Sequence, residues 1–187
     1  MSTTSRRISR APAGEIAELK RLIGELPPER LDPVLTHSSW AADRASSYER
    51  LEFLGDSVLE LAVARELFER FPDFSEGRLA KIRSHVVSRQ SCAVVSRELG
   101  LGALLRERAI GLPEAEAANL CRNRNVLAAL LEAALAALLL EHGYEAIERA
   151  VVDAFSGRIE YAHVSFVDHK TELQEGLARA GRAVNYT

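Results

Sequence analysis

A long apolar run from Val126 to Leu140, interrupted only by Glu132, constrains the fold most strongly. The run is shorter than the ~20 residues of a comfortable membrane span, so it predicts a helix buried on all sides in a protein core. A carboxylate inside such a helix is costly unless it is paired, protonated or bound to a metal. Glu132 is therefore the first residue for which a special role is expected.

The rest of the chain has the pattern of helices, without internal repeats and with little β-patterning. Apolar residues recur at helical spacing, and Pro or Gly marks the ends of segments. Residues 106–119 read as irregular or weakly helical. The prediction is an all-α domain of about seven or eight helices, which cover approximately residues 15–26, 29–36, 48–71, 78–88, 89–99, 125–141 and 144–161.

Composition and charge limit the classes of partner. Apolar residues make up 47% of the chain and charged residues 27%, as in a soluble globular protein. The net charge of −3 provides no overall attraction to nucleic acid, which local basic patches or bridging metal ions would have to hold. Cys92 and Cys121 make no metal-ligand spacing, and reduced thiols in a cytoplasmic protein are expected.

Three acids, Glu49, Glu52 and Asp56, fall on one stripe of a single predicted helix. Like charges at this spacing repel unless a cation offsets them, and clusters of carboxylates suit Mg²⁺ or Mn²⁺. A bare spacing of this kind is more often a solvated acidic face, and Glu60 extends the stripe in that sense. However, Gly55 in the middle of a helix costs about 1 kcal/mol relative to Ala, which indicates close approach of another backbone or a ligand.

The segment ERLEFLGDSVL at residues 49–59 closely resembles the signature stretch of the ribonuclease III family. The flanking order is also similar, with THSS at 36–39, FPDFSEG at 71–77 and NVLAALLEAALAALLLEHG at 125–143. Further on, DHKTELQEGLARAG resembles the first helix of the double-stranded-RNA-binding domain that follows in bacterial members. The expected organisation is a disordered basic arm (1–14), a ribonuclease III endonuclease domain (15–160), a linker (161–167) and an N-terminal fragment of an RNA-binding domain (168–187).

The resemblance implies a homodimeric endoribonuclease that processes double-stranded RNA, including ribosomal and messenger precursors. Hydrolysis would use Mg²⁺, with Mn²⁺ as a substitute, and leave 5′-phosphate and 3′-hydroxyl ends. No organic cofactor or membrane partner is expected. By position, Glu52, Asp56 and Glu132 match metal ligands, with Asp56 and Glu132 as catalytic residues. Glu49 and Glu76 match acids that line the cleft.

The resemblance also implies residues that contact partners. Phe53 matches a residue that docks into the other subunit, although ordinary core packing is an alternative. Gln174 and Glu175 lie on a helix that reaches the RNA minor groove in the family. Arg78 and Lys81, with Arg83 and Arg89, could guide phosphates to the acids; a solvated helix that exchanges ion pairs with nearby acids explains them equally well.

One position departs from the family pattern. The second acidic block usually has an Asp three residues before its Glu, and Ala129 stands there in this chain. A methyl group cannot coordinate a cation; waters, Asn123 or Asn125 could fill the gap. Two functions therefore remain open: an endoribonuclease, or a catalytically weakened or inactive dimeric protein that binds double-stranded RNA. A plain helical interaction domain would require the motif order to be coincidence.

Overall fold

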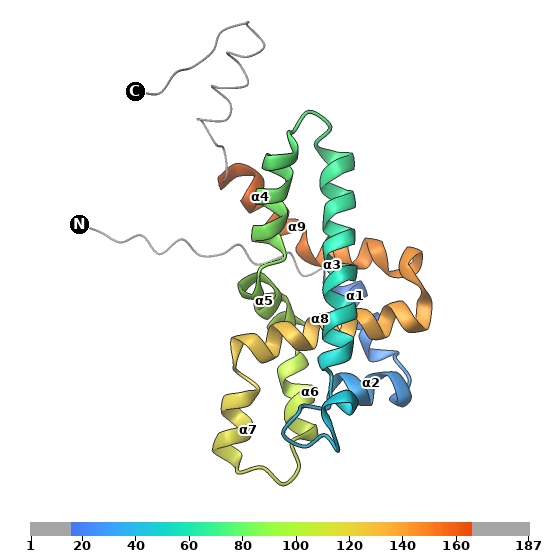
Figure 1. Cartoon of the computed structure of the whole chain (residues 1–187), viewed down its shortest axis with the longest axis vertical. Helices are drawn as coiled ribbons and strands as arrows, with labels where there is room; N and C mark the ends of the chain where they lie inside the picture. The colour runs from blue at the N-terminus through green and yellow to red at the C-terminus, as the bar shows by residue number, and fades with distance from the viewer. Residues whose placement is uncertain (1–15, 166–187) are drawn as a thin grey trace, which may run out of the picture.

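Helix α8 (Arg124–His142) is the central element of the computed structural model, which describes residues 16–165 (Figure 1). Every residue from Val126 to Leu138 is buried, Glu132 included. The most extensive contacts of α8 are with α3 (Glu49–Arg70) and α5 (Arg89–Leu99). By length and composition α8 could cross a membrane, but its apolar surface packs against these helices instead. The prediction of a helix buried on all sides is confirmed.

Residues 16–165 form nine α-helices and no strand, which confirms the all-α class. The count exceeds the predicted seven or eight because a helix starts directly after Gly100 and because residues 106–119, expected to be irregular or weakly helical, contain most of a further short helix. Gly100 ends α5 with a positive φ of 83°, and a new helix starts at the next residue, Leu101, whose side chain is fully buried. The remaining elements are α1 (Ala17–Gly24), α2 (Pro28–Val34), the 3₁₀ turn η1 (Arg44–Ser46), α4 (Glu76–Val86), α6 (Leu101–Arg108), α7 (Glu114–Leu120) and α9 (Tyr144–Ser165).

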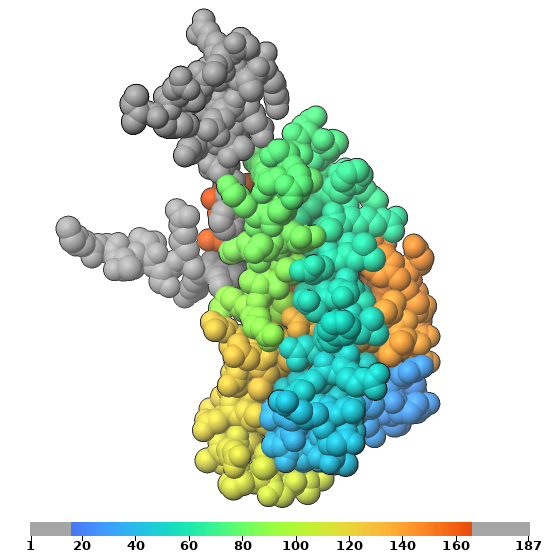
Figure 2. Space-filling model, viewed as in Figure 1, coloured from blue at the N-terminus to red at the C-terminus, as the bar shows by residue number. Residues whose placement is uncertain are grey.

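Helix α3 runs along much of the length of the molecule and crosses α8 (Figure 1). Its buried residues recur three or four positions apart and so form one face. The opposite face is open, and on the side drawn in Figure 2 α3 and α4 reach the surface while α8 is largely covered. The buried residues of α3 are Gly55, Val58, Leu59, Ala62, Val63 and Leu67.

The crossing of α3 and α8 is closest at Gly55. An ideal Cβ atom on Gly55 would lie 1.6 Å from the backbone carbonyl oxygen of Glu132, a distance that no side chain tolerates. The expectation that Gly55 marks the approach of another backbone is therefore confirmed. The approaching backbone is that of Glu132 itself, so the crossing brings the acids of α3 to the one acid in the buried part of α8.

Several predictions fall on the ends of the chain. The basic arm (1–14) and the RNA-binding fragment (168–187), with Gln174 and Glu175, lie outside the described residues. Helix α9 continues to Ser165, into the segment expected to be a linker (161–167).

Candidate active site

Glu132 is a buried carboxylate at the crossing of α3 and α8, with only 4% of its surface exposed. Its pKa is raised to about 7, first by burial and then by the negative charges of Asp56 and Glu52, whereas the Arg89 guanidinium acts in the opposite direction. Removing an anion from water is unfavourable, and two neighbouring anions add to the cost. Glu132 is therefore a group whose charged form the protein alone does not stabilise.

Helix α3 supplies the other two acids, which lie one turn apart. Asp56 is exposed, and the Glu52 side chain is 23% exposed. Both carboxylates are close enough to Glu132 to shift its pKa through their charge. The fold thus brings near one another three residues, from segments far apart in the chain, that the resemblance matched to metal ligands.

The donor chemistry of these acids fits a divalent cation. Carboxylate oxygens are the ligands that Mg²⁺ and Mn²⁺ prefer, and a cation would offset the repulsion that raises the pKa of Glu132. As placed, however, the side chains do not converge: within residues 16–165, no three His, Cys, Asp or Glu side chains form a group that could hold a metal ion. Binding would therefore require the side chains to reorient.

Arg89, the first residue of α5, provides positive charge at this point. Its Nη2 atom lies 3.3 Å from Oε1 of Glu52. The start of α5 is fixed by Ser88, whose hydroxyl accepts a hydrogen bond of 3.3 Å from the backbone N–H of Ser91. The sequence grouped Arg89 with the basic residues of α4 and missed this pairing, because only the packing of α5 on α8 places it beside Glu52.

Cys92 is a second neighbour from α5 that the sequence did not connect with the acids. Its thiol is fully buried, and its pKa is raised to about 12, first by burial and then by the negative charge of Glu132. The thiol is thus neutral and adds no ligand charge to the site.

Ala129 lies one turn before Glu132 on α8, with 3% of its surface exposed. The Asn123 side chain, one candidate to replace the missing Asp, is engaged elsewhere. Its Oδ1 atom caps α8 by accepting hydrogen bonds from the backbone N–H groups of Asn125 (2.8 Å) and Val126 (3.4 Å). Asn125 is exposed. The buried side of the site therefore holds one carboxylate and a methyl group.

The other predicted site residues lie around these acids. Glu49 faces Arg44, with 3.8 Å between Oε2 and Nε, and Glu76 is the exposed first residue of α4. Neither is among the charges that shift the pKa of Glu132. The Arg78 guanidinium stacks 3.6 Å from the centre of the Phe74 ring, and Lys81 is exposed on the same helix.

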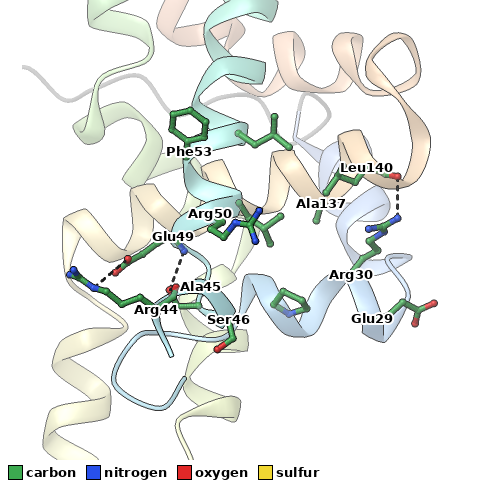
Figure 3. Close-up of a pocket in the computed structure, with 14 residues that line it drawn as sticks. Glu29, Arg30, Arg44, Ala45, Ser46, Glu49, Arg50, Phe53, Ala137 and Leu140 are labelled. Atoms are coloured by element: carbon green, nitrogen blue, oxygen red, sulfur yellow. Dashed lines mark hydrogen bonds and ion pairs between the residues drawn. The ribbon is translucent and has the colours of Figure 1, made fainter. Parts of the chain in front are cut away.

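Phe53 projects from α3 beside a groove of about 1060 Å³ (Figure 3). With 81% of its surface exposed, it is not a core residue, so the core alternative for Phe53 is wrong. Glu49 and Phe53 line this groove, whereas Glu52, Asp56 and Glu132 do not, so it lies apart from the three acids. Its apolar lining comes from Pro33, Leu51, Phe53, Leu54, Ala137 and Leu140.

Comparison with known proteins identifies the family to which this fold belongs. The family model described as Ribonuclease-III-like matches residues 28–158. The chain is 42% identical to ribonuclease 3 of Sinorhizobium medicae over 159 residues and 44% identical to that of Symbiobacterium thermophilum over 154 residues. These alignments cover 84% and 80% of this chain but 65% and 63% of the relatives, so the chain spans slightly less than two thirds of their length.

A solved structure agrees with the sequence matches. The nuclease domain of ribonuclease III from Campylobacter jejuni superposes with a TM-score of 0.64 at 32% identity, covering 76% of this chain and 97% of that domain. The all-helical architecture described above is thus that of a ribonuclease III nuclease domain. The chain belongs to the ribonuclease III-like family.

Proposed function

We propose that this protein is an endoribonuclease that hydrolyses double-stranded RNA with the help of a divalent metal ion. The observation that carries the proposal is the meeting of Glu52 and Asp56 with the buried Glu132 where α3 crosses α8 at Gly55. A buried carboxylate beside two further acids lowers stability, and a cation-dependent reaction accounts for the presence of all three. The ribonuclease 3 relatives support the same activity.

In this proposal Glu52, Asp56 and Glu132 would hold Mg²⁺, or Mn²⁺ in its place. When bound, the metal lowers the pKa of a water molecule and stabilises negative charge on the phosphate and the leaving 3′-oxygen, which gives 5′-phosphate and 3′-hydroxyl ends. Asp56, the exposed member, is on the side open to substrate, whereas Glu132 anchors the site from the core. Burial of Glu132 keeps bulk water away from its carboxylate.

The proposed substrate is an RNA duplex, which proteins recognise mainly through its shape, phosphates and 2′-hydroxyls. Arg78 and Lys81 on α4 would contact phosphates, with Glu49 and Glu76 as further acids along the cleft. Gln174 and Glu175 would contact the minor groove, as the resemblance of their segment implies. Family membership over residues 28–158 supports the roles of Glu49 and Glu76, and single substitutions can test every one of these assignments by RNA binding.

A homodimer is the proposed assembly. Phe53 exposes a large apolar ring to water beside an apolar groove on the same face of α3 (Figure 3). Exposed aromatic side chains next to apolar pockets are typical of protein interfaces. The C. jejuni nuclease domain is described as having a region involved in dimer formation, which supports the docking of Phe53 into the groove of a second copy.

Ala129 supports a second candidate function, in which the protein binds double-stranded RNA with little or no cleavage. Residues 16–165 contain no ready group of three metal ligands, and Arg89 is paired with Glu52. These observations favour a protein that binds double-stranded RNA as a dimer and cleaves it weakly or not at all. The fold and RNA-binding surface would persist without the reaction.

Cleavage of a long RNA duplex in Mg²⁺ or Mn²⁺ separates the two functions. Cleavage by the natural sequence that Glu132→Gln abolishes would establish a working site with three carboxylates. An inactive natural sequence that Ala129→Asp activates would establish the second function. Inactivity of both proteins, with RNA binding retained, would argue against the assignment of the site at this crossing.

A further inference from the structure

The position of Arg89 is not explained by the helix that carries it. Arg89 is the first residue of α5, and a cation at a helix N-terminus is unfavourable because the helix dipole is positive there. Its ion-pair partner is Glu52 on α3, not an acid of its own helix. The side chain therefore stabilises something outside α5.

The charges at the crossing show what Arg89 stabilises. Glu132 experiences the negative charges of Asp56 and Glu52, and among the residues that the structure describes Arg89 is the one positive charge that shifts its pKa. Arg89 also counteracts the effect of these acids on Tyr48 and Cys92. One guanidinium thus partly compensates a cluster whose carboxylates come from two other helices.

We infer that Arg89 is an internal counter-ion of the carboxylates and that a divalent cation must compete with it for Glu52. This inference rests on the proposed metal site and concerns its control. Arg89 is 54% exposed, so its guanidinium can leave Glu52 for solvent without unfolding α5. The charge of Arg89 offsets part of the repulsion among the acids, and its contact with Glu52 weakens metal binding because one carboxylate oxygen is already engaged.

Ala129 strengthens the competition of Arg89 with a metal ion for Glu52. A site with an additional Asp would attract a divalent cation more strongly, since each carboxylate adds negative charge next to the metal. With a methyl group at that position, the charges that meet at the crossing, among residues 16–165, are those of Glu52, Asp56 and Glu132 against that of Arg89. The pairing of Glu52 with Arg89 is thus favoured over the binding of Glu52 to the metal, and metal occupancy depends on the metal concentration.

Two measurements on the full 187-residue chain test the inference. Mn²⁺ binding is followed by electron paramagnetic resonance of the free ion, and thermal unfolding is followed in EDTA. The variants are Arg89→Gln, Glu52→Gln and their combination. Arg97→Gln is the matched control, because Arg97 is exposed at the other end of the same helix and loses the same charge.

Arg89→Gln is expected to bind Mn²⁺ about fivefold more tightly than the natural sequence, the size expected for removing a partly exposed ion pair. In EDTA it should have a lower Tm, and Glu52→Gln in the same chain should reverse part of that loss. Arg97→Gln should change neither quantity. Addition of Mn²⁺ should raise the Tm of Arg89→Gln more than that of the natural sequence.

Mn²⁺ affinity of Arg89→Gln that equals or falls below that of Arg97→Gln would overturn the competition. If Glu132→Gln nevertheless abolishes Mn²⁺ binding, the metal site stands and only the role of Arg89 fails. If the natural sequence and Arg89→Gln both bind no Mn²⁺, the competition and the proposed metal site fail together.

Discussion

Helices α3 and α8 both contribute acids to the candidate site, but they place them in opposite environments. On α3, Asp56 is exposed and Glu52 partly so, because that helix buries only one face. On α8, Glu132 lies in a helix that is buried on all sides, and its pKa is raised to about 7. A carboxylate on α3 is thus hydrated and costs little stability, whereas the carboxylate on α8 is removed from water and lowers the free energy of unfolding. The difference shows that the energetic cost of the site is concentrated on α8.

Gly55→Ala would break this arrangement with the largest effect. The added methyl group would meet the backbone carbonyl of Glu132, which cannot move like the end of a flexible side chain. Separating α3 from α8 also disturbs their extensive packing, so we expect a loss of about 3 kcal/mol or more in the free energy of unfolding. Chemical denaturation measures this loss.

The control is Gly77→Ala on α4, where nothing lies within 4 Å of the added Cβ atom. Since Ala favours a helix more than Gly, this variant should be unchanged or more stable by about 0.5–1 kcal/mol. Equal stability of the two variants would contradict the close crossing.

The pH dependence of stability sharpens the comparison between the helices. An acid whose pKa is higher in the folded than in the unfolded protein binds more protons when folded between the two values. For Glu132 these are about 7 and the ordinary 4.5, so the free energy of unfolding should fall as pH rises through this range. The cost, complete above pH 7, is about 3 kcal/mol.

Glu132→Gln removes this titration. In EDTA, urea unfolding from pH 4.5 to 8 should show a fall that is smaller by about 3 kcal/mol in Glu132→Gln than in the natural sequence. Glu60→Gln is the control, because Glu60 is exposed on α3 and its loss should leave the pH profile unchanged. Parallel profiles for all three proteins would mean that Glu132 is not destabilised as an anion.

The sequence predicts the local parts of this site better than the contacts between them. Gly55 in mid-helix and Glu132 in an apolar run each signalled a special position, and their meeting at one crossing explains both signals. The pairing of Arg89 with Glu52 was missed because the spacing along one helix carries no information about how α5 packs on α8. Likewise, α6 was missed and α7 was expected to be only irregular or weakly helical, because these short segments lack a strong local periodicity of apolar residues.

On the open face of α3, Phe53 is expected to matter for association of two chains and not for stability of the single chain. Because its ring is exposed in the single chain, Phe53→Ala should change the free energy of unfolding of the monomer by no more than about 0.5 kcal/mol. If the ring docks into the groove of a second copy, the dimer dissociation constant should rise about 30-fold or more, as for an interface hot spot. Sedimentation at several protein concentrations measures it.

Phe68→Ala is the control for Phe53, since it removes a similarly exposed ring from the same helix outside the groove. A dimer weakened equally by both variants would show that the groove does not direct association. A chain that is monomeric at every concentration would remove the homodimer from the proposal.

The smallest effect is expected at the far end of the exposed face of α3. Arg65 there pairs with Glu69 on its own helix at 3.0 Å and with Glu148 on α9 at 2.9 Å. Surface ion pairs contribute little and are screened by salt, so Arg65→Gln should cost at most about 1 kcal/mol in dilute buffer and almost nothing in 1 M salt. Urea unfolding at both salt concentrations, with Arg97→Gln for comparison, checks this. A salt-independent loss several times larger would show that Arg65 fixes α9 against α3, and the exposed half of α3 would then contribute to stability as its crossing with α8 does.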